Sequence, residues 1–276
     1  MNKLAVLALT LLLFLSAMSW YLAKGSVNDY LKSQVILQGQ YYSGQQTNIA
    51  RSIFSAEKNN AIFSSLTLAN IDGYTQVNAL TIDEIKANLI SPTDNSQPQQ
   101  LNDGLRTSQI VTLAKLTLKT VTINMEKRSD NKNNITELIE RVTLQLAKDY
   151  PALYPKLAAK IYAEQNPDLN AELNNEVHVQ PILVAKPIKE TNKAVLASKA
   201  NKQQKKLLGK AKTRIAIQLI EVNKLVIHIT ENKQSHTTEF KNINLGSIGG
   251  VNGLASNQIG GEVLRLLLQK AQVVSE

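Results

Sequence analysis

Three histidines are the first residues to consider for chemistry, because imidazole serves both metal binding and acid–base catalysis. They are His178, His228 and His236, and no cysteine and no carboxylate cluster accompanies them. A metal site needs several converging ligands with supporting neighbours, and a nucleophile needs a recognisable motif beside its base. A histidine paired with a distant serine or aspartate stays open. We expect no metal, no cofactor and no catalytic residue, and the lack of cysteine excludes thiol chemistry.

A glycine-rich run near the C-terminus could bind a phosphate through its backbone N–H groups. It reads Gly246-Ser-Ile-Gly-Gly-Val-Asn-Gly253 and precedes an apolar segment of helical spacing. The Lys-Ser/Thr pair of a P-loop is missing, as is the dinucleotide spacing with its later acidic residue. The run therefore predicts a turn before a final helix at residues 256–270.

The positive charge of the chain is concentrated in one tract. Ten basic residues and one acid lie between Lys186 and Arg214, which accounts for the whole net charge of +9. No aromatic residue lies between Tyr162 and Phe240, so base stacking on nucleic acid is not supported there. The tract is either a solvated flexible insert or a contact for anionic partners such as lipid headgroups. The candidate contacts are Lys199, Lys202, Lys205, Lys206, Lys210, Lys212 and Arg214.

The N-terminal residues 4–22 carry no charge and end in Trp20 and Tyr21. As a helix this run would reach roughly 28 Å, close to the ~30 Å hydrocarbon core of a bilayer. A cleaved signal peptide, cut after Ser19, is the alternative, but the run exceeds the usual signal core. We expect a single-pass anchor in the inner membrane, with residues after about Lys24 in the periplasm.

Short strands and two helices are predicted for the rest of the chain. Residues 26–34 are expected to form a helical or irregular stem, followed by a β-like run at residues 35–37. Residues 79–90 fit strand or helix, and residues 91–104 read as a surface loop. Asn134, with Glu137 three residues later, predicts the N-cap of a helix that stops near residue 149. A second helix is expected at residues 152–164.

Two strand segments show a slip in their alternation and resemble one another. Val121, Ile123 and Met125 fall out of phase with Leu116 and Leu118, which predicts a bulge or a bend near residue 120. A similar slip falls at residues 221–224. The segments 119–127 and 224–233 share a basic start, an alternating strand and an acidic end. This similarity is either a weak internal repeat or chance.

The order of these pieces resembles the AsmA-like envelope proteins of Gram-negative bacteria. The anchor is followed by FSSLTLANIDGYTQVNALTIDEIKANL (residues 63–89) and LAKLTLKTVTINMEKRSDNKNNITELIERV (113–142), and the chain closes with INLGSIGGVNGLASNQIGGEVLRLL (243–267). Ile71 and Asp72 depart from the proline-containing turn of that family. The resemblance implies a periplasmic β-rich module associated with phospholipid transport or envelope homeostasis. The chain is too short to bridge the periplasm by itself.

We therefore expect an α+β protein: an N-terminal transmembrane helix, then a mostly antiparallel periplasmic domain with two central helices and a C-terminal helix. Its regions are 1–24 (membrane anchor), 25–185 (β-rich with the helical pair), 186–214 (basic flexible insert) and 215–276 (strands, glycine-rich turn and helix). The expected function is non-enzymatic, with phospholipid or another envelope protein as partner and no nucleic acid. The alternative is a scaffold subunit of an envelope machine that uses the lysine-rich insert or the terminal helix.

Overall fold

The computed structural model describes residues 27–90, 100–103, 106–128, 132–165, 213–232 and 234–275. Six long strands form one continuous sheet in the order β1-β2-β3-β5-β6-β7, with β4 paired to β5 and β8 to β6. The strands are β1 (Thr47–Ser55), β2 (Asn60–Ala69), β3 (Asn78–Leu89), β4 (Gln100–Asp103), β5 (Arg106–Glu126), β6 (Thr213–Glu231), β7 (Gln234–Ile248) and β8 (Leu254–Ala255).

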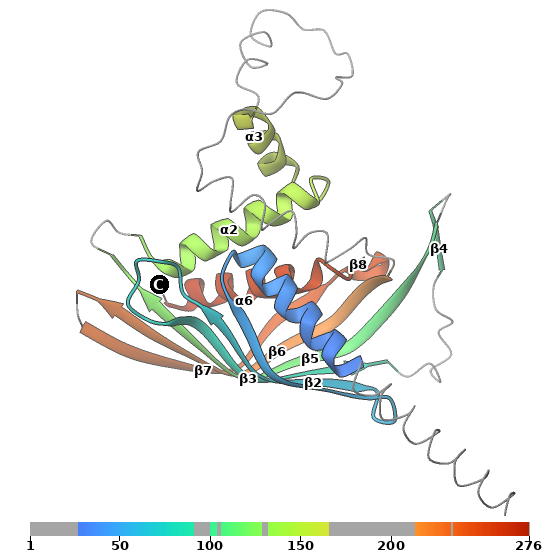
Figure 1. The fold of residues 1–276 in the computed structure, drawn as a ribbon, viewed down its shortest axis with the longest axis horizontal. Coiled ribbons are helices and arrows are strands. Elements are labelled where there is room, and N and C mark those ends of the chain that lie inside the picture. Colours follow the sequence, from blue (N-terminus) through green and yellow to red (C-terminus); the bar gives the residue numbers. More distant parts are fainter. Residues whose placement is uncertain are drawn as a thin grey trace, which may run out of the picture.

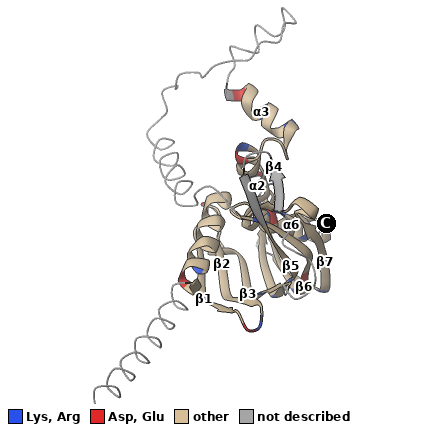
Figure 2. Cartoon of the chain, turned by 90° about the vertical axis from the view of Figure 1, so that its right-hand side faces the viewer, with Lys and Arg blue, Asp and Glu red and all other residues tan. Residues whose placement is uncertain are grey.

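Helices cover one face of this curved sheet, and the opposite face is bare of them (Figures 1 and 2). A first helix at residues 27–43, α2 (Asn134–Asp149) and α6 (Ile259–Ser275) lie over the concave face, whereas α3 (Pro155–Gln165) stands farther out beyond α2. A 3-10 turn, η1 (Gly250–Asn252), precedes β8. The expected α+β class, the mostly antiparallel sheet, the two central helices and the C-terminal helix are confirmed.

The central pair of strands, β5 and β6, is the one parallel pairing among the described strands. All the other strand pairs are antiparallel. The two segments with similar sequences therefore lie side by side, with Val121 opposite Leu225 and Ile123 opposite Ile227. This register differs by one residue from the sequence match of Lys119 with Lys224. The structure thus places the two similar segments together.

A line of phase slips crosses the six long strands. On each of them, two core-facing residues are separated by two residues instead of one, and these pairs are aligned from strand to strand. The pairs are Ile49 and Ser52, Phe63 and Leu66, Ile82 and Ile85, Leu118 and Val121, Val222 and Leu225, and Phe240 and Ile243. The strand register stays constant across these pairs, so neighbouring strands share the slip and the sheet curves into a trough (Figure 1). The slips near residue 120 and at residues 221–224 are confirmed, but the register does not shift near residue 120, so no bulge lies there.

The core is densest on one side of this line. There α2 presents an apolar stripe at helical spacing, and its four apolar core residues are fully buried: Ile135, Leu138, Val142 and Leu146. They pack in one cluster with Ile123, Leu225 and Ile227 of the central strands. At this end Ser275, the last described residue, donates a hydrogen bond to the sulfur of Met125 at 3.6 Å.

Several boundaries predicted from the sequence were wrong. Residues 35–37 belong to the helix 27–43 and not to a strand. Tyr41 and Tyr42, later in the same helix, are buried in the core and fix the helix there. Residues 100–103 form β4 inside the expected loop. The ambiguous residues 79–90 form β3 up to Leu89. The second helix starts at Pro155, after a turn, and the last helix starts at Ile259.

The helix cap at α2 is also shifted by one residue. Asn133 is the N-cap, and its side-chain oxygen accepts a hydrogen bond from the Thr136 nitrogen at 2.7 Å. Asn134 is instead fully buried. Its side chain accepts from the backbone of Glu126 at 2.9 Å and donates to the Asn124 carbonyl at 2.7 Å. Asn134 therefore ties α2 to the end of β5.

Candidate functional site

An apolar cavity of about 590 Å³ lies between the concave face of the sheet and two of the helices. Its floor comes from β2, β3, β5 and β6, and its roof from the helix 27–43 and α6. Phe54 and Leu89 at the ends of β1 and β3, with Leu113 and Thr213 near the starts of β5 and β6, line one end. The cavity therefore extends to the end of the trough at which the helix 27–43 begins.

The lining of this cavity is mostly hydrocarbon. Side chains such as Phe63, Leu80, Leu116 and Ile217 form the floor, and Leu31, Val35, Ile259 and Val263 form the roof. None of the described residues that line it is charged. The volume falls within the ~300–1,000 Å³ of small-molecule sites, which are mostly apolar with a few polar groups. The cavity is therefore suited to a hydrocarbon group and not to an ion.

The roof is held together where the helix 27–43 crosses the start of α6. The Gln38 side chain donates to the Ser256 carbonyl at 3.1 Å and accepts from the Gly260 nitrogen at 2.7 Å. Two glycines permit this approach: a Cβ on Gly260 would lie 2.7 Å from the Gln38 oxygen, and one on Gly261 would lie 2.7 Å from the Tyr42 ring. The crossing therefore fixes the position of both helices over the cavity.

The same helix closes the edge of the sheet at β1. The Asn28 side chain accepts from the Phe54 nitrogen at 2.7 Å, and the Lys32 ammonium donates to the Ala50 carbonyl at 3.1 Å. An exposed strand edge would otherwise present these backbone groups to other chains. The helix 27–43 is thus bound both to α6 and to β1, and it spans the cavity between them.

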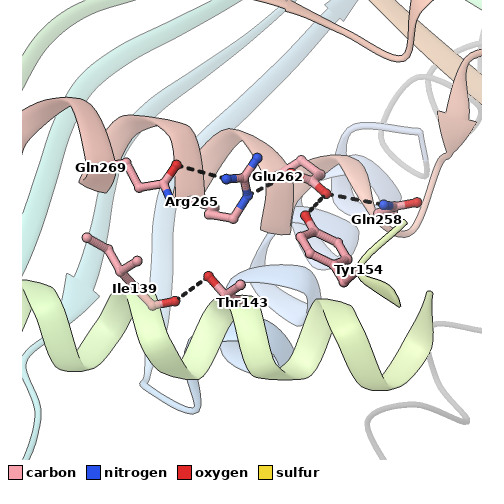
Figure 3. Close-up of polar contacts among 7 residues, drawn as sticks. All are labelled: Ile139, Thr143, Tyr154, Gln258, Glu262, Arg265 and Gln269. Atoms are coloured by element: carbon pink, nitrogen blue, oxygen red, sulfur yellow. Dashed lines mark hydrogen bonds and ion pairs between the residues drawn. The ribbon is translucent and has the colours of Figure 1, made fainter. Parts of the chain in front are cut away.

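A buried carboxylate anchors the first turn of α6 (Figure 3). Glu262 is 6% exposed, accepts from the Tyr154 hydroxyl, and pairs with Arg265 at 3.0 Å. Gln258 donates to the same carboxylate at 3.3 Å. Burial and the hydrogen bond to Glu262 raise the pKa of Tyr154. Because its hydrogen-bonding capacity is used within this network, we interpret Glu262 as structural support for the cavity wall and not as a catalytic acid.

The two histidines that the structure describes, His228 and His236, lie on β6 and β7. His228 on β6 lies 2.7 Å from the Thr237 hydroxyl, and His236 faces Ile229 in the register of β6 and β7. His178 lies outside the described residues. Within the parts of the chain that the structure describes, no group of three or more histidines, cysteines or carboxylates could hold a metal ion.

Of the candidate anionic contacts, Arg214 alone falls within the described residues. Its guanidinium donates to the Asn252 carbonyl at 2.5 Å and to the Gly253 carbonyl at 2.7 Å. It therefore closes the turn before β8. Lys199, Lys202, Lys205, Lys206, Lys210 and Lys212 lie outside the described residues, so their expected contacts with anionic partners stay a prediction.

The glycine-rich run forms a turn before the last helix, as predicted. Gly249 and Gly253 both have positive φ angles, of 88° and 60°. A Cβ on Gly249 would lie 2.7 Å from the Ile215 carbonyl oxygen, so the turn packs directly on β6. This contact positions β8 and the start of α6 against β6, which forms part of the cavity floor.

Sequence reasoning did not predict which residues line the cavity. The apolar groove was expected only from the family resemblance, and the candidate residues were placed on the lysine tract. One signal was present in the sequence: the pair Gly260–Gly261 at the start of a helix, where small residues allow close helix contact. A second was the repeated phase slip that bends the strands.

Comparison with known protein families, with curated proteins and with solved structures found no match to this chain. Among the described helices, none combines the length and the apolar character needed to cross a membrane. The uncharged run at residues 4–22 lies outside the described residues, so the expected anchor stays a prediction.

Proposed function

We propose that this protein is a non-enzymatic, membrane-anchored lipid-binding protein that shelters hydrocarbon chains in the cavity under its helices. The observation that carries the proposal is the uncharged, apolar lining of a ~590 Å³ space on the concave face of the sheet. Burying an apolar surface favours binding by about 25 cal/mol per Å². A phospholipid of the cell envelope, as the AsmA-like resemblance implies, supplies such chains.

The position of the cavity relative to the uncharged run supports a membrane source for the ligand. Tyr30 and Leu31 line the cavity at the start of the helix 27–43. Tyr30 lies eight positions after Leu22, a distance of at most ~28 Å even in a fully extended chain. With residues 4–22 in the inner membrane, the cavity stands near the bilayer on the periplasmic side.

The alternative is a scaffold subunit of an envelope machine. One of its two proposed contacts, the terminal helix, packs its apolar face inward, with Leu267, Leu268 and Ala271 at 0–1% exposure. That face is used by the core of this chain. The alternative therefore depends on the lysine-rich insert, and deletion of residues 186–212 should then remove a partner without loss of folding.

The lipid-binding proposal is tested with the full chain in phospholipid vesicles that contain a lipid with a photoreactive group at the acyl terminus. After irradiation and proteolysis, mass spectrometry should find adducts on β2, β3 and β5. Ala87→Phe fills the cavity and should reduce these adducts, because Ala87 lines the floor. Ala50→Phe, on the exposed side of β1, is the matched control. Adducts confined to residues 4–22 in the unmodified chain would contradict the proposal.

A further inference from the structure

Among the uncharged polar side chains that line the cavity, three lie near the crossing of the two roof helices. They are Gln34 of the first helix, Thr213 at the start of β6 and Ser256 just before α6. The Ser256 nitrogen donates to the Thr213 carbonyl at 3.0 Å, and the Ser256 carbonyl accepts from Gln38 at 3.1 Å. Gln34 lies one turn before Gln38, so the three line the same part of the wall; we call them the polar collar.

The polar collar has unused hydrogen-bonding capacity. Within the described part of the chain, the side chains of Gln34, Thr213 and Ser256 have no hydrogen-bond partner, although all three are partly buried. The neighbouring Gln38 differs, because both ends of its amide are bonded to backbone groups. A bound group that pairs with these side chains, as it leaves water, makes hydrogen bonds in the cavity and gains affinity.

The collar contains no cation, and no charged side chain lines the cavity among the described residues. Arg214 is adjacent to Thr213 in sequence, but its guanidinium is bonded to the Asn252 and Gly253 carbonyls. A carboxylate placed here would lose its hydration without gaining an opposite charge. An uncharged ester or hydroxyl, by contrast, can accept hydrogen bonds from the Gln34 amide and from the two hydroxyls.

We propose that the polar collar selects acyl chains that carry an uncharged ester or hydroxyl group, and that it disfavours free fatty-acid anions. The proposal rests on the proposed lipid-binding function and narrows its ligand to the ester-linked class. The ester lies at the collar, the hydrocarbon fills the apolar part of the cavity, and any charged headgroup stays outside the lining.

The test compares two probes with the same chain, monooleoylglycerol and oleate, at pH 8, where the carboxyl is ionised. Binding to the full chain is measured by displacement of an uncharged fluorescent naphthylamine. The unmodified protein should bind monooleoylglycerol at least about tenfold more tightly. Gln34→Leu should reduce that preference about tenfold and leave oleate binding unchanged. Ser256→Ala is a smaller second variant, and Gln40→Leu, a glutamine of the same helix outside the lining, is the control.

Several results would overturn the proposal in distinguishable ways. Equal affinity for both probes in the unmodified protein, or a preference retained in both collar variants, rejects the collar and leaves lipid binding in place. If neither probe displaces the dye and no photoreactive lipid is captured, the lipid-binding function itself is wrong. A preference that is lost in the Gln40→Leu control as well would also reject the collar, because the effect would then not come from the lining.

Discussion

The side-chain oxygen of Gln38 accepts a hydrogen bond from the backbone nitrogen of Gly260 at 2.7 Å, across 222 residues of sequence. At this point a Cβ on residue 260 would lie 2.7 Å from the same oxygen. The two helices that roof the cavity are thus joined by a bond that requires the absence of a side chain. Their separation, and with it the height of the cavity, follows from this contact.

Gly260→Ala should lower the free energy of unfolding by about 1–3 kcal/mol, because the added methyl group overpacks the crossing. Urea denaturation of the full chain measures the loss. Combining the change with Gln38→Ala removes the obstructing amide, so the double variant should lose less than the sum of the two single variants. Strict additivity would show that the contact does not hold the helices together.

Filling the cavity should affect stability differently from filling the packed core. Ala87→Phe places a ring in the apolar space, so we expect no loss of stability or a gain of about 0.5–2 kcal/mol. Ala79→Phe, at a position with 0% exposure outside the lining, should cost about 1–3 kcal/mol. Thermal unfolding of both variants gives the comparison. A comparable loss in Ala87→Phe would mean that the space is closed in solution.

Glu126 should be essential for the loop between β2 and β3. Its carboxylate is 8% exposed and accepts from the Thr75 nitrogen at 2.9 Å, from the Thr75 hydroxyl at 3.0 Å and from the Gln76 nitrogen at 3.2 Å. Glu126→Gln turns an N–H₂ group toward some of these donors, at an expected cost of about 1–3 kcal/mol. Urea denaturation should detect this, with Glu57→Gln in an exposed turn as a near-neutral control.

Alkaline pH should unfold the protein through its buried tyrosines. Burial raises the pKa of Tyr41, Tyr42, Tyr150 and Tyr154, and burial with a hydrogen bond to Glu137 raises the pKa of Tyr74 to about 12. Between pH 10 and 12 the unfolded chain loses phenolic protons that the folded chain keeps, so stability falls as the pH rises.

Phenolate absorbance recorded with circular dichroism checks this expectation. The buried tyrosines, Tyr41 and Tyr42 among them, should ionise together with unfolding. Tyr74→Phe should flatten the dependence of stability on pH in this range. Ionisation of all tyrosines in a single step near pH 10, without unfolding, would contradict the burial of these side chains.

Sequence reasoning succeeded where a local pattern decides the structure. The alternation of Val121, Ile123 and Met125 predicted a strand, and the phase change before it lies between Leu118 and Val121 in the structure, without the register shift of a bulge. The apolar spacing after Asn134 predicted α2, although the cap lies one residue earlier at Asn133. These features depend on neighbours within a few residues, so composition and spacing are sufficient to predict them.

Reasoning from the sequence failed where distant segments compete for the same residues. Asn134 fits an N-cap by type, yet it is buried because it can bond to the end of β5 and leave the cap to Asn133. Residues 35–37 fit a strand, yet the two tyrosines that follow, buried beneath α2 and α6, keep the segment helical. Tertiary packing outweighs the local preference in both cases.

The sequence by itself determined the uncharged run at residues 4–22, the concentration of charge in one tract, the absence of cysteine and the phase slip on individual strands. Only the tertiary structure decided that the slips align from Ile49 to Phe240, so that the sheet bends along one line and a cavity remains under the helices. The reason is physical: a phase slip alters one strand locally, but the sheet bends along a line only when the strand registers align the slips of neighbouring strands.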